Sequence, residues 1–504
     1  MVDDLVNWAS TRDLQELGVR LRSVALHHQD LRQLAQKFAL AQRQLYLVGG
    51  IIRDLLRGID PADVFSRDID LATDAHPDVV AGLLREIGWS AFDVGKRFGT
   101  VAAQAGDIIY EITTFRRDVY RPQDRHPEVT FSATIEEDLA RRDFTMNSLA
   151  VSLLHGPLVD PMGGLEDLQR KIIRTSGDPV QRFQEDPLRL MRAVRFAAQL
   201  QFRISPETSR AIRRSAQALH SISRERIRDE FTKILISAAP AYGLQLLVDL
   251  HLMAMIAPPV DVLKEYQDVT KQGFKNLLAH TFRVVQGTPP DRVLRLAALL
   301  HDVGKPQTFS QVNGQVHFFD HERVGARIAR DLLVALRFDS VTIREVVALV
   351  EAHMRPAADT DAWSDSAVRR FIREVGEERL QRLLLLARAD ITSQNTHRVT
   401  EHLKRLNRLV ERCERLLKEE HTIHPQSPLD GVQIMELTGL RPGPMIGEIK
   451  AYLLNEVLEE RLAPDDQDRA VELMWSYLRE KGLSVGRREN PSPRVEQGVQ
   501  LRSE

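Results

Sequence analysis

The chain has 504 residues, of which 43% are hydrophobic and 28% are charged, and its formal net charge is −2. This length allows about three or four domains, and the composition excludes a largely disordered chain. A net charge near zero excludes a protein that is basic throughout, so any nucleic-acid-binding surface must be local. The lone cysteine, Cys413, and the lack of a secretory signal or a long apolar run favour a cytoplasmic protein without a membrane span.

Apolar periodicity predicts different structures along the chain. Residues 1–43 are predicted to be mostly helical because leucines recur at helical spacing. Residues 44–160 mix short predicted strands with helices, and residues 100–116 fit a pair of strands joined by a turn. After about residue 178 the pattern is helical almost to the end, with breaks at prolines. The predicted fold class is therefore α+β, with a small mixed-sheet head before a long all-α region.

Two aspartates lie two residues apart in "RDIDLAT", residues 67–73. Side chains at i and i+2 of a strand share a face, so Asp68 and Asp70 are predicted to present their carboxylates together. Without a cation they would repel, and one would take up a proton. Carboxylates suit Mg²⁺, which keeps open positions for substrate phosphates, and two ions about 4 Å apart can activate a hydroxyl and stabilise a leaving oxygen. The simpler alternative is a solvated edge strand.

A glycine turn precedes these acids. Gly49 and Gly50 end a predicted strand and lead straight into a helix. Glycines let the backbone approach a ligand closely, and a helix N-terminus favours a phosphate, which Arg53 in the first turn can also hold. Alone, this fragment is more simply an ordinary strand–turn–helix. Together, "LVGGIIRDLLRG" and "SRDIDLAT" are much more specific.

These residues resemble the head of the class II tRNA nucleotidyltransferase and bacterial poly(A) polymerase family, which belongs to the polymerase-β-like nucleotidyltransferases. Family members add all or part of the CCA end to tRNA without a nucleic-acid template. The resemblance implies that Asp68 and Asp70 hold catalytic Mg²⁺, that Glu111 is a third acid near them, and that the partners are tRNA, ATP and CTP. Further family motifs follow in order up to about residue 235: "RFGTV", "EITTFR", "DRHP", "DLARRDFTMNSLA", "DPMGGLEDL" and "EDPLRLMRAVRFAAQLQF".

An aspartate and an arginine three residues apart are candidates for base selection. On a helix, Asp186 and Arg189 would share a face, and an ordinary surface ion pair is the simple interpretation. However, cytosine and adenine each present an amino donor beside a ring-nitrogen acceptor, which a carboxylate and a guanidinium match. Uracil and guanine would leave these groups unpaired. The resemblance assigns this protein-template role to the pair, with Glu185 orienting it.

The resemblance also implies further contacts with the nucleotide and RNA. Arg142 and Asp143 match the family's sugar- and phosphate-contacting motif, and Asn147 would position that segment. A polar loop at residues 117–128, where the family uses a flexible loop to switch from C to A, favours CCA or A addition over CC addition alone. This loop carries Asp118, Asp124, Arg125 and His126.

Arginines are dense over residues 182–233, where 12 basic residues face 6 acidic ones. This local excess predicts RNA phosphate contacts, although each residue also fits an ordinary charged helix face. The candidates are Arg192, Arg195, Arg210, Arg213, Arg214, Arg224, Arg226 and Arg228.

A set of histidines and aspartates follows on predicted helices. A lone helical histidine is more often a core or surface residue than a ligand, but a mixed set suits transition metals or Mg²⁺, and water bound to the metal can attack phosphorus. The order H…HD…H…H…D resembles the HD phosphohydrolase superfamily, which implies action on 2′,3′-cyclic phosphates or 2′-nucleotides. An inactive domain kept as a binding wall is the alternative. The set is His280, His301, Asp302, His321, His353 and Asp390.

Three other functions stay open: a poly(A) polymerase, an A-adding or CC-adding half-enzyme, and a nucleotide-responsive phosphohydrolase whose head only binds nucleotide. The sequence gives no oligomeric state. The predicted regions are a helical extension (1–43), the nucleotidyltransferase head (44–160), a neck (161–270), the HD domain (271–395), a helical C-terminal region (396–484) and a disordered tail (485–504).

Overall fold

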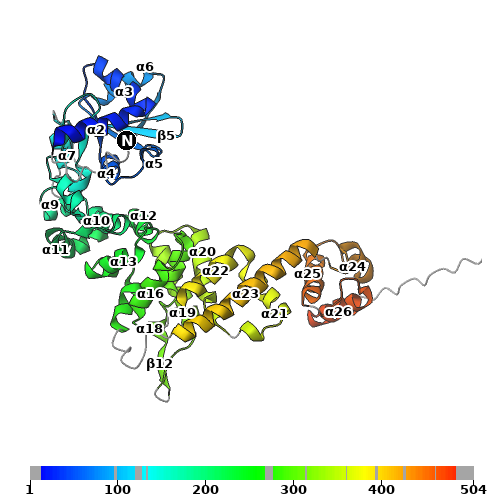
Figure 1. Ribbon diagram of the computed structural model, residues 1–504. Coiled ribbons are helices and arrows are strands. Elements are labelled where there is room, and N and C mark those ends of the chain that lie inside the picture. The colour runs from blue at the N-terminus through cyan, green and yellow to red at the C-terminus, as the bar shows by residue number, and fades with distance from the viewer. Residues whose placement is uncertain are drawn as a thin grey trace, which may run out of the picture. The chain divides into compact units, whose positions relative to one another are not determined.

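The computed structural model describes residues 13–95, 99–119, 128–131, 134–266, 276–312, 315–358, 360–391, 396–423, 427–459 and 461–483. The chain divides into two compact units, Met1–Val350 and Glu351–Glu504. A mixed sheet lies near the start of the first unit and helices dominate the rest, which confirms the predicted α+β class (Figure 1). Within the described residues, no helix is long and apolar enough to span a membrane.

The head contains a seven-stranded sheet with the order β3-β4-β5-β2-β1-β8-β9. In its centre β2 runs parallel to β5 and antiparallel to β1, so the sheet is mixed. Burial alternates where a strand has one solvent-facing side, as in β2, where Ile69 and Leu71 are buried and Asp70 is exposed. The strands are β1 (Leu45–Val48), β2 (Ile69–Thr73), β3 (Ser90–Gly95), β4 (Thr100–Ala105), β5 (Ile108–Thr114), β8 (Ala150–Ser152) and β9 (Leu158–Val159).

Helices surround this sheet. The N-terminal helix α2 packs closely on the β8–β9 turn. The approach is so close that a Cβ on Gly18 would lie 2.7 Å from the carbonyl oxygen of Gly156. Arg22 donates to the carbonyl oxygens of Ser152 and Gly156, each at 3.1 Å. The described part of the extension, residues 13–43, therefore packs against the head. The helices are α2 (Leu14–His27), α3 (Gln29–Leu40), α4 (Gly50–Leu56), α5 (Pro61–Phe65), α6 (Pro77–Glu86), α7 (Ile135–Ala140), the 3₁₀ helix η3 (Thr145–Asn147) and α8 (Gly164–Gln169).

The prediction of a loop over residues 117–128 is wrong at both ends of this range, where the structure has strands. Strands β6 (Arg116–Val119) and β7 (Glu128–Phe131) pair antiparallel there. Charge and proline content predicted a loop, but a polar segment can also form the arms of an exposed hairpin. Residues 120–127, with Asp124, Arg125 and His126, lie outside the described residues, as does the side chain of Asp118.

The neck and the following helices complete the first unit. Proline stands at the start of α9, α11, α13 and α15, where its missing N–H costs no helical hydrogen bond. The helices are α9 (Pro179–Glu185), α10 (Leu188–Leu200), α11 (Pro206–Ser215), η4 (Ala216–Ser221), α12 (Arg224–Leu235), α13 (Pro240–Asp249), α14 (Met253–Ile256), α15 (Pro258–Asp261), α16 (Leu277–Gln286), α17 (Arg292–Leu300), α18 (Lys305–Thr308), α19 (His321–Ala335) and α20 (Ser340–Ala352), whose end enters the second unit.

The expectation of helices alone after residue 178 missed an antiparallel hairpin, β12 (Phe309–Val312) and β13 (Gln315–Phe318). Two shorter strands, β10 (Ile172–Ile173) and β11 (Arg203–Ile204), pair parallel between head and neck. Four-residue strands carry too little periodicity to be separated from helix ends in a sequence.

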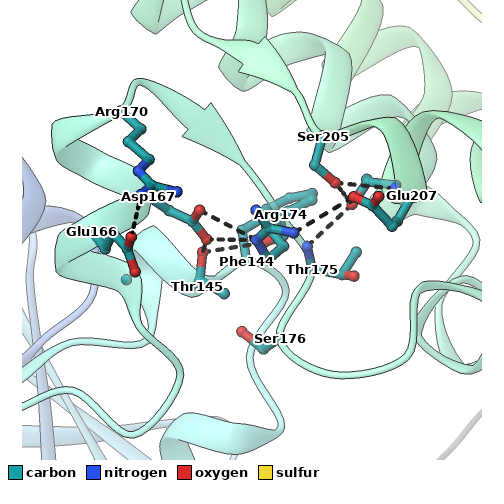
Figure 2. A network of polar contacts seen from close by, with 12 residues as sticks. Phe144, Thr145, Glu166, Asp167, Arg170, Arg174, Thr175, Ser176, Ser205 and Glu207 are labelled. Carbon is teal, nitrogen blue, oxygen red and sulfur yellow. Dashed lines mark hydrogen bonds and ion pairs between the residues drawn. The ribbon is translucent and has the colours of Figure 1, made fainter.

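A polar network ties η3 of the head to α8 and to the start of α11 (Figure 2). The Thr145 hydroxyl donates to Asp167 at 2.7 Å, and Nε of Arg174 donates to both oxygens of the same carboxylate, at 3.1 and 3.2 Å. Arg174 also pairs with Glu207 at 3.6 Å. These contacts fix the segment that carries Asp143 and Asn147 against the neck.

The second unit is helical throughout its described residues. Its last three helices have a core of their own, in which Ile434, Ile449, Leu453 and Met474 are fully buried. The predicted tail from residue 485 lies outside the described residues. After α20 the helices are η6 (Arg355–Ala357), η7 (Thr360–Ala362), α21 (Asp365–Val375), α22 (Glu377–Asp390), α23 (Thr396–Ile423), α24 (Gly431–Thr438), α25 (Pro444–Leu458) and α26 (Gln467–Glu480).

Candidate functional site

Three carboxylates gather on the central strands of the head. Asp68 stands directly before β2, Asp70 is on β2, and Glu111 on β5 is the register partner of Asp70. Desolvation raises the pKa of Asp70, and Asp68 raises it further while Arg142 opposes the shift. Desolvation, Asp70 and Asp68 likewise raise the pKa of Glu111. Negative charge is thus concentrated here, as a cation site made only of oxygen donors requires.

The carboxylates form an open arrangement. Among the described residues, groups of three side chains whose ligand atoms all lie within 4.8 Å of one another occur elsewhere. Asp68, Asp70 and Glu111 are not part of such a group. Asp68 and Asp70 are exposed, and Glu111 is half-buried. The arrangement leaves room for substrate oxygens beside the three side chains.

A cavity of about 510 Å³ adjoins Asp70. Its walls come from the β1–α4 turn, from β2, from the segment around η3, and from the junction of α9 and α10. It therefore joins segments more than a hundred residues apart in the sequence. Asp68, Glu111, Glu185 and Arg195 do not line it. Eleven of the predicted residues do: Gly49, Gly50, Arg53, Asp70, Arg142, Asp143, Asn147, Asp186, Arg189, Arg192 and Arg226.

The glycine turn is fitted to an arginine of the same cavity. Gly49 has a φ of +76°, and a Cβ there would lie 3.0 Å from Nη1 of Arg142. Its N–H donates to the carbonyl oxygen of Leu149 at 3.2 Å. The positive φ favours glycine at this position, because other residues adopt it at a cost.

A chain of hydrogen bonds braces one wall of the cavity. Nη1 of Arg53 donates to Oδ1 of Asn147 at 2.8 Å, and Nδ2 of Asn147 donates to Asp143 at 3.1 Å. Nε and Nη2 of Arg192 donate to Asp143 at 2.9 and 2.6 Å. Burial works to raise the pKa of Asp143, but Arg192 and Asn147 outweigh it and lower the pKa. The carboxylate therefore stays ionised and holds both neighbours in place.

A second buried carboxylate holds two more arginines. Asp138 has no exposed surface and accepts from Arg141 at 2.6 Å and from Arg142 at 3.2 Å. Burial works to raise its pKa, but the two guanidiniums prevail and lower it. Nε of Arg142 is buried without a hydrogen-bond partner. The Arg142 residue also lines the cavity, and its guanidinium charge there suits an anionic ligand such as a phosphate.

The expected helical pairing of Asp186 and Arg189 is wrong. Asp186 lies between α9 and α10 with φ −142° and ψ 98°, because the following Pro187 disfavours a helical conformation at the residue before it. No ion pair joins the two side chains. Asp186 contacts Arg226 at 3.4 Å, whereas Arg189 donates to Glu185 at 3.0 Å.

The Arg189 side chain is only 8% exposed and is fixed from three sides. Besides Glu185, it donates to the carbonyl oxygens of Arg182 at 3.2 Å and Arg141 at 3.1 Å. Glu185 in turn accepts from Arg182 at 2.8 Å. The geometry therefore gives Glu185 contact with Arg189 rather than with Asp186.

The sequence interpretation overlooked an aromatic ring in this wall. Phe196 lines the cavity, and the guanidiniums of Arg53, Arg192 and Arg195 lie over it at 5.3, 5.5 and 4.0 Å from the ring centroid. Arg195 also pairs with Glu230 at 2.6 Å, so it supports the wall from behind. The signal was the helical spacing of Arg192 and Phe196, which places them on one face.

A histidine–aspartate cluster lies farther along the first unit. His280 is on α16, His301 and Asp302 follow α17, and His321 begins α19. All four are buried. Nε2 of His280 and Nε2 of His301 lie 3.3 Å apart, and Asp302 lies 3.3 Å from His301 and 3.6 Å from each of His280 and His321.

Backbone contacts orient two of these imidazoles. Nδ1 of His301 lies 2.8 Å from the carbonyl oxygen of Ala298, and Nδ1 of His321 lies 2.9 Å from that of Phe318. A carbonyl oxygen only accepts, so Nδ1 carries the proton and Nε2 is left as an acceptor toward the cluster. This is the orientation that a metal-binding histidine takes.

The carboxylate at the centre of the cluster has a lysine beside it. Lys305 donates to Asp302 at 2.6 Å. Burial works to raise the pKa of Asp302, but His301 and Lys305 hold it well below its usual range. The cluster thus offers imidazole nitrogens with an ionised carboxylate, a donor set that suits a divalent transition metal.

The two remaining predicted ligands belong to the second unit. His353 is buried just after α20, and Asp390 is the last residue of α22. Their participation in the cluster stays a prediction.

Comparisons with known proteins match this architecture. Residues 45–174 match the poly A polymerase head domain, residues 201–263 match the probable RNA and SrmB-binding site of polymerase A, and residues 277–395 match the HD domain. The chain is 34% identical over 452 residues to the A-adding tRNA nucleotidyltransferase of Deinococcus radiodurans, covering 85% of this chain and 95% of that protein. The chain therefore belongs to the tRNA nucleotidyltransferase and poly(A) polymerase family and carries an HD domain.

Other relatives match part or all of the chain. The CCA-adding enzyme of Lactobacillus helveticus is 44% identical over 210 residues, which is 42% of this chain and 50% of that enzyme. The crystal structure of the Bacillus stearothermophilus CCA-adding enzyme in complex with CTP superposes with a TM-score of 0.64 and 28% identity, covering 90% of this chain and 98% of that one. The Thermotoga maritima CCA-adding enzyme with tRNA shares the fold, with a TM-score of 0.56 and 20% identity over 93% of this chain and 99% of that one.

Proposed function

We propose that this protein adds C and A nucleotides to the 3′ end of tRNA without a nucleic-acid template. The observation that carries the proposal is the single cavity that joins Asp70, the Gly49 turn and Arg189. Such a reaction needs three parts: carboxylates that bind metal, cationic groups that bind phosphate, and a rigid group that reads the base.

The reaction transfers a nucleotidyl group. The terminal ribose hydroxyl oxygen of the RNA forms a bond to the α-phosphorus of the nucleotide, the bond from that phosphorus to the β-phosphate oxygen breaks, and pyrophosphate leaves while the hydroxyl proton passes to solvent. Asp68, Asp70 and Glu111 would hold Mg²⁺, which supplies activation of the hydroxyl and neutralises phosphate charge. Arg142, which lines the cavity, would hold the triphosphate or the ribose through its guanidinium.

Base selection would depend on how firmly Arg189 is held. Three fixed acceptors restrict its side chain, so its guanidinium cannot turn to suit a different base. Asp186 would supply the carboxylate half of the template and would exchange its contact with Arg226 for the amino group of cytosine or adenine. Leaving one buried polar group unpaired with uracil or guanine costs about 1–3 kcal/mol.

Addition of the final A alone is the second candidate function. In the sequence comparison, the A-adding relative of Deinococcus radiodurans matches along 95% of its length, whereas two CCA-adding relatives match over 50% and 53% of theirs. The test uses tRNA transcripts that lack A, CA or CCA, with Mg²⁺ and with CTP or ATP singly and together. Extension of all three to CCA supports the first proposal, and extension only of the transcript ending in CC, by ATP, supports the second. Long tails of A on any RNA would contradict both.

We also propose that the histidine–aspartate cluster is a metal-dependent phosphohydrolase that opens 2′,3′-cyclic phosphates. One P–O bond to the ribose breaks, water supplies the new P–O bond, and its proton goes to the freed ribose oxygen. Imidazoles with oriented Nε2 atoms, and Asp302 held ionised, support a bound metal whose contribution is an activated water. Hydrolysis of adenosine 2′,3′-cyclic phosphate by the wild type, with loss in His301→Ala, tests this.

A further inference from the structure

The hairpin of β12 and β13 carries aromatic side chains that differ in their packing. It extends away from the helices of the first unit around it (Figure 1). Phe309 and Phe318 are register partners, and their ring centroids lie 6.1 Å apart. Tyr266 packs on Phe309 at 6.4 Å, and Nζ of Lys305 lies 5.6 Å from the Phe318 ring. This inner group anchors the hairpin to the body of the unit.

A second aromatic pair has no such anchoring role. The rings of His317 and Phe319 stack with centroids 5.0 Å apart and an interplanar angle of 7°. Phe319 is 65% exposed, the largest exposed fraction of any described phenylalanine side chain. Neighbouring strand residues point to opposite faces. Phe318 is on the anchored face, so His317 is on the other face. A parallel stack with one ring open to solvent is a surface that suits another flat ring.

The segment that carries this pair is joined to the histidine–aspartate cluster through Phe318, which lies between the two rings in the sequence. Phe318 accepts from Nδ1 of His321 through its carbonyl oxygen, and Lys305, which lies over the Phe318 ring, donates to Asp302. Phe319 is two residues from His321, so their Cα atoms are at most about 7 Å apart. Asp320 between them has a φ of 57°, a conformation that is uncommon outside glycine, and it makes the sharp turn from β13 into α19. The turn therefore keeps the backbone of Phe319 close to His321, at the start of α19.

We propose that His317 and Phe319 form a stacking platform for the nucleobase of the molecule that the cluster hydrolyses. The proposal deepens, and rests on, the phosphohydrolase function proposed above. A base stacked on Phe319 would hold the attached ribose phosphate next to the cluster. The substrate class is then a nucleoside phosphate, either free or at an RNA 3′ end, rather than any small phosphate ester. Stacking tolerates every base, because each has a π-face.

The kinetic test compares adenosine 2′,3′-cyclic phosphate with methyl riboside 2′,3′-cyclic phosphate, which has no base. Base–aromatic stacking is worth about 1–3 kcal/mol by substitution, so Phe319→Leu should raise KM for the adenosine substrate at least about fivefold. It should leave kcat/KM for the methyl riboside within about twofold, and Phe319→Trp should retain the wild-type preference. Val334→Ala, at a similarly exposed position on α19, is the matched control and should change neither substrate. An equal loss on both substrates in Phe319→Leu would overturn the platform.

A third substrate separates the two sources of the nucleoside phosphate. An RNA hairpin that ends in a 2′,3′-cyclic phosphate presents the same terminal group on RNA. If Phe319→Leu raises KM for the RNA as well as for the free nucleotide, the platform binds RNA ends. If it raises KM for the free nucleotide alone, the platform binds mononucleotides only.

A binding measurement keeps the platform separate from the hydrolase. The emission of Phe319→Trp, after subtraction of the wild-type signal, should be quenched by adenosine 2′-phosphate and not by methyl riboside 2′-phosphate. If the wild type hydrolyses nothing but this quenching occurs, the phosphohydrolase proposal fails and the platform stands. If adenosine 2′-phosphate causes no quenching, the platform fails whatever the hydrolysis result.

Discussion

The acid cluster of the head and the histidine–aspartate cluster differ in how their carboxylates are surrounded. In the head, Asp70 has like-charged neighbours, is exposed, and has a raised pKa. In the other cluster, Asp302 is 2% exposed, is surrounded by imidazoles and Lys305, and has a lowered pKa. The first arrangement suits ions that arrive with substrate phosphates, and the second suits an ion held by the protein itself. Four substitutions test this contrast.

The largest effect is expected from Asp70→Asn. Removing a carboxylate from the head cluster should lower nucleotide addition at least about 1,000-fold, because several kcal/mol of transition-state stabilisation depend on it. Thermal stability should not fall, since the substitution removes a carboxylate whose charge is disfavoured in the folded protein. Incorporation of labelled ATP or CTP into tRNA measures the loss. Asp107→Asn, an exposed aspartate on the β4–β5 turn, is the control.

His301→Ala should lower hydrolysis of the cyclic phosphate at least about 100-fold and reduce the bound metal, because a buried ligand is lost. Nucleotide addition should remain within about twofold of the wild type. Metal content by elemental analysis provides a readout separate from turnover, and exposed His220→Ala is the control. Loss of both activities in this variant would mean that the two clusters do not act independently.

Arg192→Ala tests the braced wall of the head. Asp143 would lose, while buried, the guanidinium that donates twice to its Oδ2, which should destabilise the protein by about 3 kcal/mol at pH 7. The folded-state pKa of Asp143 is lowered, so its stabilisation is present above the unfolded value near 4 and is lost as the pH falls through the folded value. The difference between wild type and variant in denaturant unfolding should therefore narrow below about pH 4. A difference independent of pH would assign it to lost packing on Phe196.

The smallest effect is expected from Arg189→Lys. Lysine keeps the charge but not the fixed fork that contacts Glu185 and two carbonyl oxygens, so ATP and CTP use should fall about tenfold. Misincorporation of UTP and GTP should rise relative to the correct nucleotides. Competition assays with mixed nucleotides measure this ratio, and Arg85→Lys, at an exposed position of α6, is the control. Unchanged selectivity would remove Arg189 from base reading.

Much of the head could be predicted from local sequence. The strand–turn–helix around Gly49, the strand of Asp70 and the pair of strands at residues 100–116 follow from alternation and glycine placement, which depend on neighbouring residues alone. The short strands of the hairpin at Phe309 and the arms around residues 117–128 were missed, because a strand of four residues is stabilised by its partner rather than by its own pattern.

Some contacts of the site could come only from the tertiary structure. Pro187 separates Asp186 from the helix of Arg189, and the orientation of Arg189 depends on a carbonyl oxygen 48 residues away. The ring of Phe196 beneath three arginines and the orphaned Nε of Arg142 likewise result from packing between distant segments. The amino-acid order specifies which chemical groups are present and how they are spaced along the chain. The fold decided which of them meet, because contact between distant residues depends on packing that no local pattern encodes.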